Sequence, residues 1–152
     1  MIELIRIDDR LAHGQVMAVW APALNIDHLL VADDETAGDA FARQVMQLAM
    51  PRGMTLIVDT IAGAGPRLAA AARDTHRWLV LLRDVASAIR LRKAYPFDAL
   101  NVGGIGMMPG RRLVWRSIAL SPEEAAALRA LRAQGVDVYL QMLPSDPKKR
   151  EW

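Results

Sequence analysis

The most constraining feature of this chain is a regular alternation of short apolar runs with segments of helical periodicity. The apolar runs are typical of buried parallel strands, and the segments between them are long enough for helical crossovers. We expect strands at residues 2–7, 28–32, 54–58, 77–82, 98–102, 113–118 and 136–142, and helices at residues 15–24, 34–49, 61–73, 85–94 and 122–134. Right-handed crossovers then predict a single doubly wound α/β domain over residues 1–152, with helices on both faces of a mostly parallel sheet of about seven strands.

Two of the expected helices have clear start signals. Asp33 precedes an acidic first turn, as an N-cap residue does. Ser121 is followed by Pro122 and, three residues after the cap, by Glu124, which is the pattern of a capping box. Gly135 is a suitable residue to end that helix.

The glycine-rich stretch after the fifth expected strand is predicted to be a long loop. Gly103, Gly104, Gly106 and Gly110, with Pro109 among them, disfavour regular structure. No helix follows the stretch, so it does not fit a dinucleotide-binding fingerprint. Two interpretations remain: a loop shaped for the approach of a ligand, or a flexible connection. The strand after it is expected to be antiparallel or to lie at an edge.

Composition excludes several classes of chemistry. The chain has no cysteine, which rules out disulfides, thiolate nucleophiles, iron–sulfur clusters and cysteine zinc sites. His13, His28 and His76 are the only histidines, and no two of them stand at metal-ligand spacing, so we expect no metal and no cofactor. A polar N-terminus and the lack of a long apolar segment favour the cytoplasm.

The charge pattern bears on the kind of partner. All but three of the 19 basic residues are arginine, and the formal net charge is +2. The arginine bias mildly favours an anionic ligand, although a GC-rich genome also explains it. Acidic residues are interleaved with the basic ones, and the only basic run, residues 148–150, is expected to be a solvated tail. Nucleic acid is therefore not an expected partner.

The turn after the first strand contains the most chemistry. Its segment, residues 6–16, reads Arg-Ile-Asp-Asp-Arg-Leu-Ala-His-Gly-Gln-Val. His13 stands just before a predicted helix, whose unpaired amide groups suit a phosphate. Gly14 permits close approach, Arg10 can add a two-point contact, and Asp8 or Asp9 can orient the imidazole as a nucleophile. The alternative is a structural histidine that caps or lines the loop.

Other candidate residues favour structural roles. His28 opens a strand and His76 precedes one at the amino end of the sheet, so we expect both to be structural or surface residues. Met107 and Met108 are expected in the core or on a partner surface. Asp33, Asp34 and Asp59 suggest a receiver domain, but Asp59 comes too early in the chain and no lysine ends a late strand. Helix capping explains these acidic residues better.

The histidine turn resembles the signature R-x-D-x-R-L-x-H-G-Q-V of IIB components of the phosphotransferase system, mannose/fructose/sorbose family. The resemblance continues at residues 31–39, 50–53, 100–105, 120–124 and 135–144, and so covers essentially the whole chain. Ala12 departs from it, since the family usually carries a larger aliphatic residue there. The fold that this resemblance implies is similar to the one predicted above.

The resemblance also implies a function. A IIB component takes a phosphoryl group from a phosphohistidine of the IIA protein and passes it to a sugar translocated by the membrane proteins IIC and IID. Carried over, His13 is phosphorylated at Nδ1, Arg10 binds the phosphate, the Gly14 and Gln15 amides cradle it, and Asp8 organises the loop. The protein would then be cytoplasmic and peripherally associated with the permease.

Two alternatives differ from transport. A regulatory phosphohistidine module would use the same chemistry at His13 without moving a sugar. A phosphohistidine mutase or phosphatase would need a second catalytic histidine, and neither His28 nor His76 is suitably placed. The sugar and the oligomeric state, with a homodimer among the options, are not determined by the sequence.

Overall fold

The protein, described here by a computed structural model of residues 1–152, is built on a six-stranded parallel sheet. The strand order is β3-β2-β4-β1-β5-β8, and every neighbouring pair is parallel. The strands are β1 (Ile2–Asp8), β2 (His28–Ala32), β3 (Thr55–Asp59), β4 (Trp78–Leu82), β5 (Ala99–Gly104) and β8 (Asp137–Leu140). The doubly wound α/β class predicted from the alternation is confirmed.

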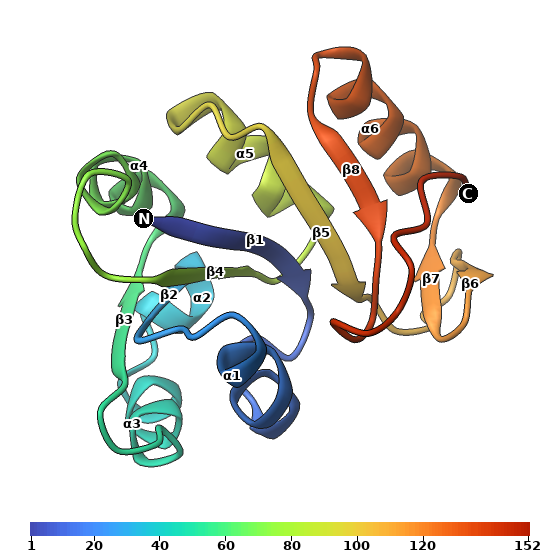
Figure 1. Cartoon of the computed structure of the whole chain (residues 1–152). Helices are drawn as coiled ribbons and strands as arrows, with labels where there is room; N and C mark the ends of the chain where they lie inside the picture. Colours follow the sequence, from blue (N-terminus) through green and yellow to red (C-terminus); the bar gives the residue numbers. More distant parts are fainter.

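Helices cover both faces of this sheet (Figure 1). On one face lie α4 (Ile61–Ala71), α5 (Val85–Ala94) and α6 (Pro122–Ala133). The other face packs against a π-helical stretch, η1 (Val16–Trp20), which continues into α1 (Ala21–Ala23). Two further helices, α2 (Asp34–Ala37) and α3 (Ala40–Leu48), follow β2. None of these helices combines the length and apolar character that a membrane crossing requires.

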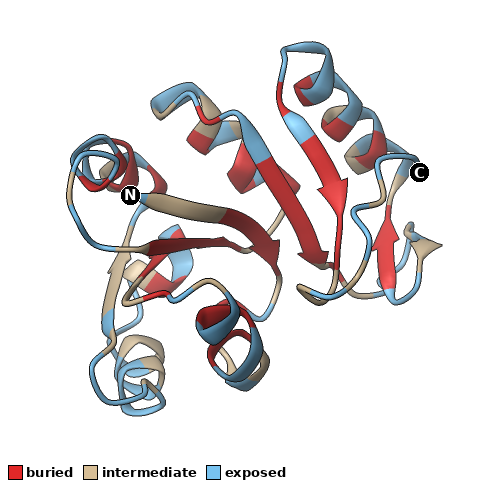
Figure 2. Cartoon of the chain, viewed as in Figure 1, coloured by how far each residue is buried: buried red, intermediate tan, exposed pale blue.

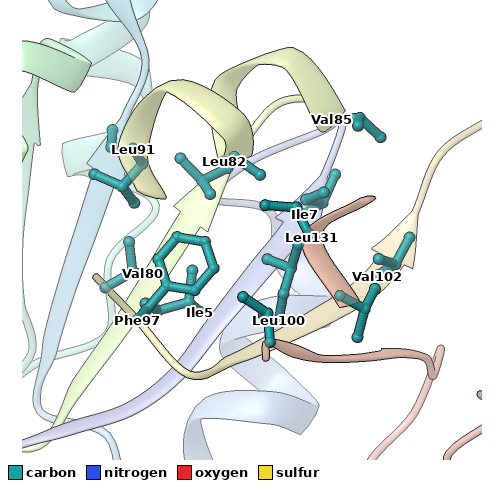
Figure 3. Packing of buried hydrophobic residues seen from close by; sticks show 14 of the residues in the cluster. Ile5, Ile7, Val80, Leu82, Val85, Leu91, Phe97, Leu100, Val102 and Leu131 are labelled. Carbon is teal, nitrogen blue, oxygen red and sulfur yellow. The ribbon is translucent and has the colours of Figure 1, made fainter. Parts of the chain in front are cut away.

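Alternating side chains along the strands belong to two separate apolar clusters, one on each face of the sheet. Ile5 and Ile7 of β1 pack with the α4–α6 layer, together with Val80, Leu82, Leu100 and Val102 of the neighbouring strands (Figure 3). Leu79 and Leu81 of β4 face η1 and α1 instead. All five residues of β4 are buried, as the central strands in Figure 2 show. A strand buried on both faces needs a continuous apolar run, which is why the sequence pattern identified it.

Truncating a core residue tests this packing. Leu82 is fully buried, so Leu82→Ala should lower the free energy of unfolding by about 2–5 kcal/mol through lost transfer energy and a residual cavity. Leu48→Ala is the matched control, because Leu48 is 80% exposed and its loss should change stability by less than about 0.5 kcal/mol. Urea denaturation measures both. Equal effects of the two variants would contradict the assigned core.

One expected strand is in fact a hairpin. The sequence pattern predicts a single strand at residues 113–118, but β6 (Arg112–Trp115) and β7 (Ile118–Leu120) form a separate antiparallel pair. The two-residue turn between them begins at Arg116, which has a φ of 49°. Its guanidinium lies 4.7 Å from the centroid of the Trp115 ring and pairs with Asp146 at 2.9 Å. The ion pair with Asp146 is a tertiary contact, and it favours a turn where the local pattern indicated a strand.

The expected helix at residues 34–49 is also interrupted. It divides into α2 and α3 at Gly38, and Asp39 starts the second helix by accepting a hydrogen bond from the Ala42 N–H. The other capping predictions are confirmed: Asp33 caps α2, and Ser121 forms a capping box with Glu124. Gly135, with a φ of 93°, follows the end of α6.

Candidate functional site

The loop after β1 lies at the point where the direction of the chain connections changes. From β1 the chain passes to η1 on one face, whereas from β5 it passes through the hairpin to α6 on the other face (Figure 1). Ligands of parallel α/β sheets bind beyond the strand ends at such a point. Two hydrogen bonds join the flanking loops: Asp9 N–H donates to the Gly104 carbonyl at 2.7 Å, and Gly106 N–H donates to the Asp9 carboxylate at 2.8 Å.

His13 is held with its two ring nitrogens in different environments. Its Nε2 lies 3.1 Å from Oδ2 of Asp8. Its Nδ1 accepts a hydrogen bond from the backbone N–H of Gln15 at 3.3 Å. A neutral imidazole has one N–H and one lone pair, so these partners place the proton on Nε2 and the lone pair on Nδ1. The side chain is 16% exposed, and in this tautomer the free lone pair of the ring belongs to Nδ1.

Asp8, the last residue of β1, has a fully buried carboxylate that is surrounded by donors. Oδ1 accepts from the backbone N–H of Arg10 at 3.1 Å, and Oδ2 accepts from Nη2 of Arg6 at 3.4 Å in addition to facing His13. The sequence left Asp8 and Asp9 as alternatives for orienting the imidazole. The structure places Asp8 against the ring, while Asp9 binds the opposite loop.

Arg6 is a buried cation beneath the loop, and the sequence assigned it no separate role. Its side chain is 1% exposed, and burial lowers its pKa to about 10 against the opposing attraction of Asp8. Nη1 donates to Oδ1 of Asn101 and to the Gln141 carbonyl, and Nη2 donates to the Met142 carbonyl. A sequence signal did exist: Arg6 lies between Ile5 and Ile7, two apolar residues of the first strand. Such a residue needs partners from other strands, which the sequence does not reveal.

Gly103 and Gly104 belong to β5, which corrects the expectation that they are part of a loop. A Cβ at Gly103 would collide with the Arg6 guanidinium, and a Cβ at Gly104 would lie 2.6 Å from Oδ1 of Asp8. Glycine is present here because buried charged side chains of β1 pack directly onto the β5 backbone. The loop itself is limited to residues between β5 and β6.

Arg10, Gly14 and Gln15 lie together at the surface. The Arg10 side chain is 57% exposed, and its Nη2 donates to Oε1 of Gln15 at 2.9 Å. Gly14 and Gln15 begin the helical segment that continues into η1, and the His13 carbonyl accepts from the Met17 N–H at 3.1 Å. The predicted phosphate ligands are thus close to His13, at the start of a helical turn whose amides favour an anion.

The loop is anchored by a strained but buried residue. Leu11 has a φ of 57°, a left-handed conformation that costs on the order of 1–3 kcal/mol and that only surrounding structure can maintain. Its side chain is 1% exposed and packs in the same cluster as Trp20. Ala12 is also buried in this cluster. This packing holds the backbone that leads into His13.

Exposed apolar side chains border the site. Met107, Met108 and Leu113 are between 56% and 59% exposed. A shallow hollow between the two loops is lined by Arg10, Gln15, Met107 and Leu113, among others. The two methionines therefore lie at the surface. The expectation that they are core residues is wrong, and a partner surface is the remaining interpretation.

The acidic residues that suggested a receiver domain are paired with arginines. Asp33 accepts two hydrogen bonds from Arg83, at 3.1 and 2.8 Å. Asp34 pairs with Arg90 and Asp59 with Arg67. The pKa of Asp33 is lowered: burial acts to raise it, but the bonds from Arg83 and Thr36 outweigh burial. These contacts fit helix capping and ion pairing rather than a phosphorylated aspartate.

The lowered pKa of Asp33 predicts a pH dependence of stability. A carboxylate with a lowered folded-state pKa stabilises the fold above its ordinary pKa of about 3.9, and this contribution is lost as the pH falls through the lower folded-state value. Asp33→Asn should therefore reduce the free energy of unfolding by a constant amount above about pH 5 and by a shrinking amount below about pH 4. Urea titrations across this range test it; a difference that grows on acidification would contradict it.

Comparison with known proteins decides what kind of protein carries this site. Residues 2–152 match the family model described as the PTS system sorbose subfamily IIB component. The chain belongs to this family. A probable phosphotransferase enzyme IIB component of Streptococcus pyogenes is 35% identical, covering 97% of this chain and 95% of that protein.

Two further relatives extend the match. The crystal structure of manxB from Thermoanaerobacter tengcongensis superposes with a TM-score of 0.88 at 32% identity, covering 99% of this chain and 92% of that one. The mannose-specific EIIAB component of Escherichia coli is 28% identical over 97% of this IIB chain, which spans 46% of that longer protein.

Membership establishes the general activity. This IIB component is a phosphotransferase that acts as a phosphocarrier in a sugar phosphotransferase system. IIB components of this family work with a IIA protein and with membrane IIC and IID proteins. The Escherichia coli relative is named as an EIIAB component, which combines IIA and IIB. None of the relatives named above is described as a regulatory module.

Proposed function

We propose that His13 accepts the phosphoryl group on Nδ1 from a phosphohistidine of IIA and passes it to a sugar that IIC and IID translocate. The observation that supports this proposal is the division of roles between the two ring nitrogens: Nε2 faces the Asp8 carboxylate, and the lone pair of Nδ1 faces the start of a helical segment. Such an arrangement makes one nitrogen a nucleophile without the prior removal of a proton.

The transfer balances without a further reactant. The P–N bond of the donor phosphohistidine breaks as the lone pair of His13 Nδ1 forms a new P–N bond. The proton on Nε2 stays in place, so the ring gains positive charge while the phosphoryl group adds negative charge. Asp8, which faces Nε2 at 3.1 Å, stabilises the charged ring in the way that a triad aspartate stabilises an imidazolium.

Three groups would hold the phosphoryl oxygens. Arg10 would leave Gln15 Oε1 and make charge-assisted bonds, since its exposed side chain can reorient. The Gly14 and Gln15 amides would donate at the start of the helical segment. The Gln15 N–H now bonds to Nδ1 at 3.3 Å, a long contact that it can exchange for a phosphoryl oxygen when Nδ1 becomes bonded to phosphorus.

The exposed rim supports the use of one surface for both partners. Met107 and Leu113 are apolar and exposed, and they line the same hollow as the cationic side chain of Arg10. IIA and the permease would dock here in turn, which places the protein at the cytoplasmic side of the membrane in peripheral association with IIC and IID. Phosphoryl transfer between histidines depends on positioning and charge stabilisation, so a shallow site is sufficient.

The test is phosphorylation of the whole chain. We expect phosphoenolpyruvate, enzyme I, HPr and a IIA protein to add one phosphoryl group, measured by intact mass, which is labile in acid and stable in base. Nitrogen NMR of the phosphorylated imidazole should assign the bond to Nδ1. Omitting IIA is the control and should abolish the gain. A base-labile aspartyl phosphate, a bond at Nε2, or no gain with active IIA proteins would overturn the proposal.

A further inference from the structure

Two histidines meet at the amino end of the sheet, opposite the phosphoryl site. His28 is the first residue of β2, and His76 lies in the turn just before β4. Because β2 and β4 are paired, with His28 opposite Trp78, the turn is brought against the start of β2. The two imidazole rings stack with centroids 3.9 Å apart and planes inclined at 28°. From sequence spacing we expected no histidine-built metal site, since these residues are far apart along the chain.

A carboxylate completes the cluster. Oδ1 of Asp27 lies 2.8 Å from Nδ1 of His28, and Oδ2 lies 3.9 Å from Nδ1 of His76. One ligand atom from each of the three residues lies within 4.8 Å of the other two. Tetrahedral coordination with bonds of about 2 Å separates ligand atoms by about 3.3 Å, so the ligand atoms must move closer and one of the stacked rings must turn its lone pair toward the ion. The His76 ring can make this movement, because its side chain is 50% exposed and the residue lies outside the helices and strands.

The surroundings orient the carboxylate without neutralising it. The backbone N–H of Arg77 donates to Oδ1 of Asp27 at 2.9 Å, which is the kind of contact that fixes a metal ligand from behind. The Arg77 guanidinium is directed elsewhere, to the carbonyls of Leu24 and Asn25. Oδ2 of Asp27 therefore keeps its lone pairs available beside His76.

The turn that carries His76 is itself held in place. Oδ1 of Asp74 accepts from the His76 backbone N–H at 3.0 Å, and both oxygens of Asp74 accept from Nε1 of Trp78. The Trp78 ring in turn lies 4.7 Å from the His28 ring. The backbone positions of both histidines are thus set by the fold, and metal binding would mainly require rotation of one side chain.

We propose that Asp27, His28 and His76 bind a divalent transition-metal ion, with water completing its coordination. Imidazole nitrogens with one carboxylate suit Zn²⁺, Cu²⁺ or Ni²⁺ better than Mg²⁺ or Ca²⁺, which favour all-oxygen sites. The bound ion would connect the start of β2 to the turn before β4. The site is independent of phosphoryl transfer, because His13 lies beyond the opposite ends of the strands.

Titration of the untagged, chelator-treated chain tests the site. We expect Zn²⁺ to bind with one-to-one stoichiometry by calorimetry, and Co²⁺ to give the absorption of a nitrogen-ligated ion. His76→Asn should weaken Zn²⁺ binding by roughly tenfold or more, and as a half-exposed residue it can be replaced without loss of folding. His13→Ala is the matched control and should bind Zn²⁺ unchanged, since the chain has no cysteine and only three histidines.

Each opposite result would overturn the proposal. The first is the absence of saturable binding to the unaltered chain at millimolar Zn²⁺. The second is an unchanged Zn²⁺ affinity of the His76→Asn chain, and the third is the loss of Zn²⁺ binding in the His13→Ala chain. The last would place the ion at the phosphoryl loop instead. Phosphorylation of the His76→Asn chain should proceed at the rate of the unaltered chain, so failure of the metal proposal is distinguishable from failure of the proposed function.

Discussion

A chain with His13→Ala is expected to gain no phosphoryl group from phosphorylated IIA. The chain has no cysteine, and the other two histidines, His28 and His76, lie at the amino end of the sheet. In the proposed transfer, a docked IIA phosphohistidine therefore meets one histidine, His13. The expected effect is complete loss of the mass gain and of phosphate delivery to the permease.

The control for this experiment is His28→Ala, which should take up one phosphoryl group as the unaltered chain does. Circular dichroism of the His13→Ala chain should remain unchanged, because His13 lies outside the helices and strands and removal of its ring leaves the core intact. A stoichiometric, base-stable phosphoryl group on a folded His13→Ala chain would show that another residue is the acceptor.

Replacing Asp8 by Asn is expected to slow phosphoryl transfer by about 10²- to 10⁴-fold, the upper figure being the loss that the equivalent change causes in a Ser-His-Asp triad. The Asp8 carboxylate accepts bonds from Arg6, Arg10 and the Nε2–H of His13. An amide has one oxygen for these donors, and its NH₂ group would face one of them. Where it faces His13 it favours the Nε2 lone pair, which moves the proton onto the nucleophilic Nδ1.

Asp8→Asn should also lower stability, because it leaves the buried Arg6 cation without its carboxylate. Breaking a buried pair costs about 3–5 kcal/mol, so transfer rates must be compared where both proteins are folded. Asp9→Asn is the matched control: Asp9 binds the Gly106 N–H instead of the imidazole, and its loss should change the rate by less than about tenfold.

Two readouts separate positioning from folding in this comparison. Single-turnover transfer from phospho-IIA gives the rate, and nitrogen NMR of the folded chain gives the tautomer of His13. We expect Nε2–H in the unaltered chain and an increased share of Nδ1–H in Asp8→Asn. A folded Asp8→Asn chain that keeps both the Nε2–H tautomer and the rate would remove Asp8 from the proposed mechanism.

The Arg6 network explains why this loop can be both exposed and well positioned. A buried guanidinium connects β1 to Asn101 on β5 and to carbonyls that follow β8. The same Arg6 guanidinium lies 4.6 Å from the centroid of the Trp20 ring, and Trp20 belongs to the helical segment that begins beside His13. The His13 imidazole is therefore supported, through Asp8 and Arg6, by β1, β5 and the segment after β8, although the loop itself is short.

Local patterns in the sequence predicted most of the helices and strands and drew attention to the histidine turn. Strand β4 and the capping of α2 and α6 depend on residues near one another in the chain, so hydrophobic period and cap identity predict them. The motif around His13 likewise contains the proposed nucleophile and the nearby Arg10. The resemblance to the IIB family rests on these same local residues.

Other features of the fold and the site depend on contacts between residues that are distant in the sequence, and only the tertiary structure shows them. The sequence pattern predicts a loop at Gly103 and Gly104. The structure shows that they form the end of β5, with Arg6 and Asp8 packed onto them. Two other features also depend on distant partners: the turn of the hairpin, where Arg116 pairs with Asp146, and the position of Asp9, which binds the Gly106 N–H while Asp8 faces His13.

The meeting of His28 and His76 is a further case. Strand pairing alone brings these histidines together. The physical reason is that a periodic pattern encodes which face of an element is buried. Which strand lies beside it, and therefore which buried charge must find a partner there, is determined only when the whole sheet has formed.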